Sequence, residues 1–375
     1  MAWCKEKEDA NMLTKGDEYP LHQTPEPMAL SGGNRNFYDR YFFNGYSPDG
    51  NIFFAAALGI YPQLDIMDAA FCVSIDGKQH NLRASKRMSS ERLDLTVGPV
   101  TVTIIEPLQQ LGLTVTGNDS AITAEIRFTA RHQPIEEPRF IRRDGPRLLM
   151  DYTRMTQNGD WSGTITVDGQ DIDIGNCRGT RDRSWGIRQV GASESQPPPA
   201  GAFPQFWWLW TPLNFDDHAC FFHSNDDGDG LPWNRRGVVD AISGSVTEFE
   251  PKTIDLSYHS GSRRIKQVRL ATGNGSLSIT PRTGNAARSF YMSGLGYLHP
   301  VWGHGMDHGD LEVAHDVIFL DPAPAIDMTT IHIQALSDTV LTVNGREHHG
   351  IGVVEQLFIG PHATTGLSGL MDPAV

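Results

Sequence analysis

An aspartate surrounded by arginines lies near the middle of the chain, in residues 179–188 (GTRDRSWGIR). In an apolar cavity the pKa of Asp182 would rise, because desolvation disfavours the carboxylate, and the group could then deliver a proton. The neighbouring guanidinium groups lower the pKa instead, and they could hold Asp182 in a structural ion-pair network. On a straight strand Asp182 and Trp185 face opposite sides, unless Gly186 permits a bend. Both interpretations of the carboxyl group stay open at this point.

Two segments are dense in aromatic residues. The block YFFNGY runs from Tyr41 to Tyr46 and mostly predicts core packing, but these two tyrosines carry hydroxyl groups that need partners when buried. The block FPQFWWLW contains Trp208 and Trp210, which alternate onto one side of a strand. Because aromatic faces favour cations and large apolar ligands, we predict a cavity wall here, with plain packing as the alternative.

A third segment, HPVWGHGMDHGD, brings together histidines, a tryptophan and an aspartate. His299, His304 and His308 could suggest zinc, but the glycines between them prevent the shared helical face of an HExxH motif. We therefore predict no metal and take His304 as an acid/base residue in a cleft loop, oriented by Asp307. His299 and Trp302 are candidate substrate contacts. Structural loop histidines are the alternative.

Composition excludes several classes of function. The chain has 375 residues, 39% hydrophobic and 20% charged, which is typical of a globular protein with sizeable cores. Its net charge of −14 disfavours a nucleic-acid or anionic-membrane partner. No apolar run reaches the roughly 18 residues of a spanning helix, and residues 1–15 do not resemble a secretory signal. The four cysteines are scattered without a CxxC pair, so we expect a reducing, cytoplasmic location.

The dominant sequence period is two. Apolar and polar residues alternate over residues 122–129, and residues 100–104, 164–167 and 330–334 repeat the pattern. Asp-Gly or Asn-Gly pairs, which are typical of tight hairpin turns, follow such runs at residues 76–77, 168–169 and 344–345. Glycine and proline together number 61 (38 + 23), which leaves little room for helices. The sequence therefore predicts an all-β protein.

A proline run marks the boundary between two parts of the chain. Residues 196–201 (QPPPAG) are typical of an extended linker. We predict an N-terminal arm over residues 1–30, an N-terminal β-module over residues 31–190 and a C-terminal β-module over residues 191–375.

Residues 179–188 resemble the signature of the carotenoid 1,2-hydratase (hydroxyneurosporene synthase)-like family of tandem lipocalin-like proteins. This family is related to tocopherol cyclase-like and kievitone hydratase-like enzymes and to certain fungal Diels–Alderases. The resemblance spans about residues 35–320 and is supported by the segments 41–46, 151–154, 157–161 and 299–305. It implies two lipocalin-like antiparallel β-barrel or sandwich modules packed side by side, an apolar ligand and no cofactor. Several relatives have a histidine where Arg183 stands here, so only Asp182 and Trp185 carry over.

Together these features predict a cofactor-independent enzyme that protonates a C=C bond or an allylic alcohol of a hydrophobic, isoprenoid-like substrate. Hydration, dehydration, isomerisation and cyclisation are all open as outcomes. Protonating an alkene needs a strong acid, aromatic faces near the cation and control of water. Asp182 and His304, with Asp307, would supply the acid/base groups. The predicted substrate contacts are Tyr41, Tyr46, Trp185, Trp208, Trp210, His299 and Trp302.

Two other functions remain open. A lipocalin-like fold equally suits a non-catalytic carrier of a steroid, terpenoid or fatty acyl ligand, because fold alone does not determine function. A metal-dependent lyase that uses the three histidines at positions 299, 304 and 308 is the weaker alternative. A homodimer is compatible with the sequence.

Overall fold

Strands dominate the fold, as the period of two predicts. The computed structural model describes residues 13–20, 33–89, 91, 93–194, 205–242, 244–273, 275–283 and 289–374. Within these ranges there is no α-helix, and the helical turns are short 3-10 segments: η1 (Lys15–Glu18), η3 (Pro62–Leu64), η5 (Met292–Leu295) and η6 (Ala363–Thr365).

The first antiparallel sheet takes most of its strands from the N-terminal half of the chain. Its main order is β22-β4-β3-β2-β1-β13-β11-β8-β7-β6-β5, and β9, β10 and β12 pair with the long strand β11. The strands are β1 (Phe37–Tyr46), β2 (Phe53–Tyr61), β3 (Ile66–Ile75), β4 (Lys78–Arg87), β5 (Thr96–Val97), β6 (Val100–Glu106), β7 (Gln110–Val115), β8 (Ile122–Ala130), β9 (Ile135–Glu136), β10 (Phe140–Asp144), β11 (Arg147–Val167), β12 (Gln170–Asp173), β13 (Arg178–Arg188) and β22 (Leu311–Phe319).

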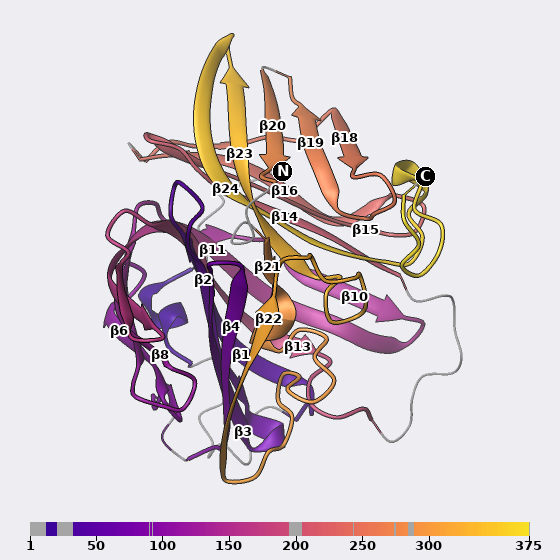
Figure 1. Cartoon of the computed structure of the whole chain (residues 1–375). Helices are drawn as coiled ribbons and strands as arrows, with labels where there is room; N and C mark the ends of the chain where they lie inside the picture. Colours follow the sequence, from indigo (N-terminus) through magenta and orange to yellow (C-terminus); the bar gives the residue numbers. More distant parts are fainter. Residues whose placement is uncertain are drawn as a thin grey trace, which may run out of the picture.

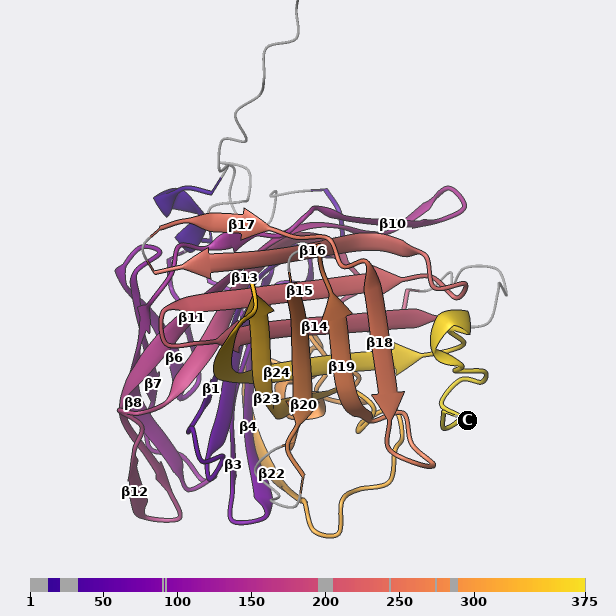
Figure 2. The same cartoon turned by 90° about the horizontal axis from the view of Figure 1, so that it is seen from above.

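The second antiparallel sheet comes from the C-terminal half. Its order is β17-β16-β15-β14-β24-β23-β20-β19-β18, with β21 beside β23. Figure 2 shows its strands from above, lying across the end of the first sheet. The strands are β14 (Phe206–Asn214), β15 (His218–Asp226), β16 (Pro232–Ala241), β17 (Val246–Glu248), β18 (Thr253–Tyr258), β19 (Ile265–Ala271), β20 (Gly275–Pro281), β21 (Ser289–Tyr291), β23 (Ile333–Val343) and β24 (Arg346–Ile359).

Burial explains the two kinds of strand sequence. β8 alternates buried and more exposed residues because one of its faces meets the core and the other meets solvent. β2, with the sequence FFAAALGIY, is buried along its whole length because both of its faces are covered. The predicted hairpin turns are confirmed: Asp76 and Asn344 have positive φ, and so have the glycines that follow them.

Three main hydrophobic clusters define the layers. One fills the interior of the curled first sheet and another fills the second sheet. The third lies between the sheets and draws residues from both halves, among them Phe42 of β1 and Trp210 of β14. Figure 1 shows the second sheet packed over β11 and β13. The protein is therefore all-β, with two lipocalin-like antiparallel modules side by side, which confirms the predicted fold class.

One strand crosses from the C-terminal half into the first sheet. β22 pairs antiparallel with β4, so a segment of the predicted C-terminal module extends the N-terminal sheet. The described part of the predicted arm, Leu13–Pro20, packs on the first sheet through the fully buried Glu18. The division of the chain into an arm and two modules stays a prediction.

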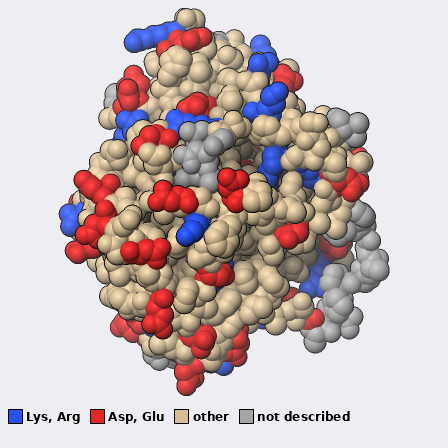
Figure 3. Space-filling model, viewed as in Figure 1, with Lys and Arg blue, Asp and Glu red and all other residues tan. Residues whose placement is uncertain are grey.

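Acidic side chains outnumber basic ones on the face shown in Figure 3, in keeping with the net charge of −14. The short helical turns in the described ranges are neither long nor apolar enough to cross a membrane.

Candidate functional site

Asp182 faces the space between the two sheets. On β13 it lies opposite Phe42 of β1 and Thr156 of β11, and Phe42 belongs to the cluster between the sheets. Its side chain is buried, with only 8% of the residue exposed. Among the described residues, its carboxyl group has no hydrogen bond and no ion pair. A buried, unpaired carboxyl group is unusual, because buried charges are normally paired and hydrogen-bonded.

Burial raises the pKa of Asp182 to about 6, because desolvation disfavours the carboxylate. The positive charge of Arg154 lowers the pKa, whereas the nearby Glu137 and Glu355 raise it and Arg40 lowers it. A carboxyl group with this pKa is partly protonated near neutral pH and can act as a proton donor there.

Arg154 does not neutralise Asp182, because Glu137 engages it. Its Nε and Nη2 atoms donate to the two carboxylate oxygens of Glu137 at 3.0 and 2.9 Å, a bidentate pair. The guanidinium carbon lies 4.4 Å from the ring centre of Trp208 and 5.7 Å from that of Trp210. Glu137 also accepts hydrogen bonds from Thr156 at 2.5 Å and from Trp210 Nε1 at 3.3 Å. The pair therefore packs against both tryptophans of β14.

A second buried carboxylate, Glu355 of β24, lies beside Trp208. It accepts hydrogen bonds from Trp208 Nε1 at 2.9 Å, Gln334 Nε2 at 2.6 Å and His332 Nε2 at 2.8 Å. Burial alone would raise the pKa of Glu355, but His332, then Gln334 and the charge of Arg154, together lower it. The remaining ring nitrogen of His332, Nδ1, is buried and has no hydrogen-bond partner among the described residues. The two predicted tryptophans of β14 are thus each anchored to a buried carboxylate.

Two arginines, Arg40 and Arg188, lie around Tyr297. Arg40 is 1% exposed, and its guanidinium carbon lies 4.9 Å from the centre of the Tyr297 ring. In the part of the chain that is described, its Nε and Nη1 atoms lack hydrogen-bond partners, and Nη2 donates to Leu295 O at 3.3 Å. Arg188 also approaches Tyr297, at 5.8 Å, and stacks on Tyr38 at 4.5 Å. Buried donors without partners mark a place where a polar ligand group or water would bind.

His304 lies next to Arg188, with both ring nitrogens engaged. Arg188 Nη2 is 3.1 Å from Nδ1, and Leu295 O is 3.1 Å from Nε2. An arginine can only donate and a carbonyl can only accept, so the ring is the neutral tautomer with its proton on Nε2. Burial, followed by the charges of Arg40 and Arg188, lowers the pKa of His304 well below its ordinary value. The predicted catalytic role of His304 stays a prediction.

The other predicted residues of the first sheet lie on both of its faces. Tyr46 belongs to the cluster between the sheets, and its hydroxyl accepts a hydrogen bond from Asn214 Nδ2 at 2.9 Å. Tyr41 faces the interior of the first sheet and donates to Glu18 O at 2.5 Å. Trp185 lies beside Arg183, on the face of β13 opposite to Asp182, as a straight strand requires.

The segment after η5 does not gather at Asp182. Asp307 is exposed and pairs with Arg87 at 2.8 Å. His299 Nδ1 accepts the backbone N–H of Trp302 at 2.9 Å, and the Trp302 ring stacks on His308 at 3.9 Å between centres.

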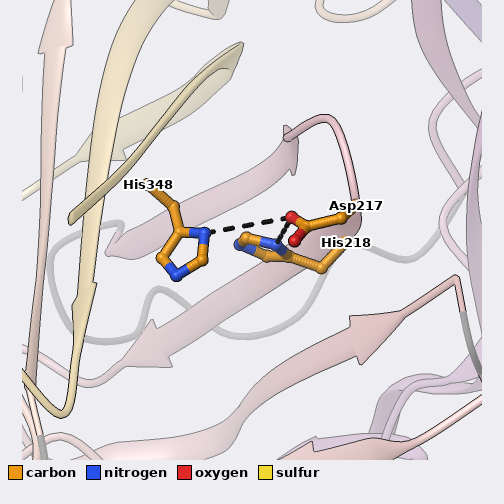
Figure 4. Close-up of side chains that lie close together, drawn as sticks. All are labelled: Asp217, His218 and His348. Atoms are coloured by element: carbon orange, nitrogen blue, oxygen red, sulfur yellow. Dashed lines mark hydrogen bonds and ion pairs between the residues drawn. The ribbon is translucent and has the colours of Figure 1, made fainter. Parts of the chain in front are cut away.

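The structure brings a different set of potential metal ligands together. Figure 4 shows Asp217, His218 and His348 facing one another at the end of the β14–β15 turn. His218 Nδ1 lies 2.6 Å and His348 Nδ1 3.9 Å from Asp217 Oδ1. The hydrogen bond of His218 and the approach of His348 to the exposed carboxylate account for this proximity without an ion, and we assign no metal to the group.

Sequence reasoning missed the two buried glutamates and most of the other polar residues around Asp182. Arg188 stands on β13 within residues 179–188, and Arg154 stands within residues 151–154, so these two lie in segments that carried the family resemblance. The others come from separate segments of the chain and share no short motif with Asp182. The missed residues are Arg40, Glu137, Arg154, Tyr297, His332 and Glu355.

Solved structures with a similar fold include a candidate AttH protein from Nitrosomonas europaea, with a TM-score of 0.50, 15% identity and coverage of 88% of this chain and 95% of that chain. Kievitone hydratase from Nectria haematococca gives 0.46 at 11% identity, covering 85% and 88% of the two chains. CghA with Sch210972 gives 0.47 at 10% identity, covering 86% and 89%. At these identities the similarity concerns the fold alone.

No curated protein matches the chain by sequence. Membership of the carotenoid 1,2-hydratase-like family stays a prediction. The family of unknown function DUF8625 matches residues 13–368, which is nearly the whole chain, and the protein belongs to this family.

Proposed function

We propose that this protein is a cofactor-independent acid/base enzyme in which Asp182 protonates a C=C bond or an allylic alcohol of a hydrophobic, isoprenoid-like substrate. One observation carries the proposal: a buried carboxyl group faces the space between the sheets, has no partner among the described residues, and has a pKa of about 6. Such a group has a proton to donate near neutral pH, and the aromatic side chains of the cluster between the sheets suit a hydrophobic substrate.

The proton would pass from the Asp182 carboxyl to an alkene carbon, or to a hydroxyl group that leaves as water, and a carbocation would form on the substrate. Glu355 is suited to stabilise this cation, because Trp208 and Gln334, two of its three donors, are neutral. Glu137 is less suited, because Arg154 already compensates its charge. Addition of water, followed by loss of a proton to the Asp182 carboxylate, would give hydration. Direct return of a proton from the cation to Asp182 would give an isomer or a diene. Attack by a second double bond would give a cyclic cation, which would then lose a proton to the same carboxylate.

The proposal is tested by incubating the full chain with a series of linear isoprenoid alkenes and allylic alcohols and following products by mass spectrometry. Asp182→Asn keeps the shape of the side chain but removes the proton, so we expect kcat to fall by about 100- to 10,000-fold. Substrate binding should change only slightly. Asp171→Asn, at an exposed carboxylate on β12 with no assigned role, is the matched control and should leave kcat unchanged. Full activity of Asp182→Asn would refute the assigned role.

A carrier of hydrophobic small molecules is the second candidate. It is favoured by a cavity of about 250 Å³ in the second module, which is lined in part by Leu277, Leu341 and Val343. A carrier would bind isoprenoids without converting them, so no product would form. Asp182→Asn would then leave ligand binding unchanged. The product analysis above separates the two functions.

A further inference from the structure

The strand β22 forms an open edge of the first sheet. It pairs with β4 on one side, and no strand within the described ranges pairs with its other side. Figure 1 shows it next to β4 at the end of that sheet. An edge strand of nine residues presents unpaired backbone N–H and C=O groups and is a ready template for another strand.

The same edge exposes large apolar side chains. Leu311, Val313, Val317 and Phe319 are 56%, 38%, 39% and 64% exposed. Because their positions differ by even numbers, all four lie on one face of the strand. Soluble proteins usually protect long edge strands with charges, prolines or covering segments, and an exposed apolar edge indicates a surface that another chain covers.

We propose that β22 pairs antiparallel with β22 of a second copy of this chain, about a twofold axis at His315. In this register Leu311 faces the partner's Phe319, and Val313 faces the partner's Val317. The apolar pattern L-x-V-x-H-x-V-x-F is symmetric about its centre, so each exposed apolar side chain gains an apolar neighbour. The two first sheets then join into one continuous sheet, and an isologous contact of this kind closes as a dimer.

Charge selects this register over its neighbours. A shift by two residues in one direction places Asp316 opposite the partner's Asp316, and a shift in the other direction places Glu312 opposite the partner's Asp316. Like charges directly opposite each other destabilise a strand pair. In the proposed register Glu312 faces the partner's Ile318 and Asp316 faces the partner's Ala314. At the axis, His315 faces the partner's His315.

A disulfide at the axis tests both the contact and its register. Opposite residues of an antiparallel pair have Cα atoms about 4.5–5.5 Å apart, which suits a disulfide. In a Cys4→Ser background, His315→Cys should therefore form a covalent dimer on mild oxidation. Glu312→Cys, on the same strand, should not, because it faces the partner's Ile318. Equal cross-linking of the two variants, or no cross-linking at position 315, would overturn the proposal.

Sedimentation of the full chain provides the second readout. We expect a dimer at micromolar concentration, and we expect Val317→Lys to weaken it by about tenfold or more, since a lysine then opposes the partner's Val313 twice in each dimer. Val246→Lys places the same charge on β17, an edge strand of the second sheet where Val246 is 56% exposed, and should leave the dimer intact. A monomeric wild type, or equal effects of the two lysines, would contradict the proposal.

Discussion

On the face of β13 that lines the interior of the first sheet, each arginine has a carboxylate partner. Arg181 donates to both oxygens of Glu18 at 2.8 and 2.7 Å, and Arg183 pairs with Asp39. On the face toward the second sheet, Asp182 has no such partner among the described residues. The sequence around Asp182 suggested that its neighbouring arginines would bind it, but alternation along the strand sends them to the other side.

This difference separates structural charges from a chemically available one. A buried ion pair with several hydrogen bonds holds both groups in their charged forms and locks the segments that carry them. An unpaired buried carboxyl group instead gains stability by taking up a proton. The two faces of one strand therefore serve different purposes, and substitutions on each face should have opposite effects on stability.

The largest effect is expected on the paired face. Glu18→Gln removes the charge that compensates Arg181, whose side chain is fully buried. Breaking a buried pair from one side costs about 3–5 kcal/mol, because the remaining charge is left uncompensated, and we expect the free energy of unfolding to fall by that amount. Urea denaturation measures it. A loss below about 1 kcal/mol, as for a surface pair, would show that the Glu18 segment does not hold the first sheet together.

The opposite sign is expected for Asp182→Asn. The pKa of Asp182 is raised to about 6 from 3.8, so its contribution to stability is fully present below pH 4 and is lost as the pH rises through 6. The neutral asparagine avoids this loss. The variant should therefore be more stable than the wild type by about 3 kcal/mol at pH 8, and the gain should disappear below about pH 4.

Urea denaturation of both proteins across this pH range gives the test, and the difference between them cancels the other titrating groups. A variant that is less stable than the wild type at pH 8 would mean that Asp182 has a partner after all.

The sequence predicts which face of a strand a residue occupies better than it predicts which residues pack against that face. The period of two correctly separates Asp182 from Trp185 and places Trp208 and Trp210 together, because alternation is a local property of a strand. It does not show that Glu355, more than 140 residues further on, lies beside Trp208 (355 − 208 = 147). That contact depends on how the two sheets pack.

Long-range packing also explains the residues that local patterns misplace. Glu18 stands in a polar, proline-punctuated segment that predicts an arm over the surface, yet its carboxylate is fully buried against Arg181. Nothing near Glu18 in the sequence indicates the cation that it meets. The segment that contains His304 and Asp307 suggested one acid/base pair, but the half-buried His304 contacts Arg188, whereas Asp307 is exposed.

The smallest expected effect compares the two tryptophans of the site. Trp208→Phe removes the 2.9 Å hydrogen bond to Glu355, a carboxylate whose other close partners are His332 and Gln334. A hydrogen bond to a charged group contributes about 2 kcal/mol, so the free energy of unfolding should fall by about that amount. Trp210→Phe should cost less, because its bond to Glu137 is 3.3 Å long and Arg154 already compensates that carboxylate. Equal losses in urea denaturation would mean that the two glutamates are compensated alike, and Glu355 would then lose its assigned role in stabilising a substrate cation.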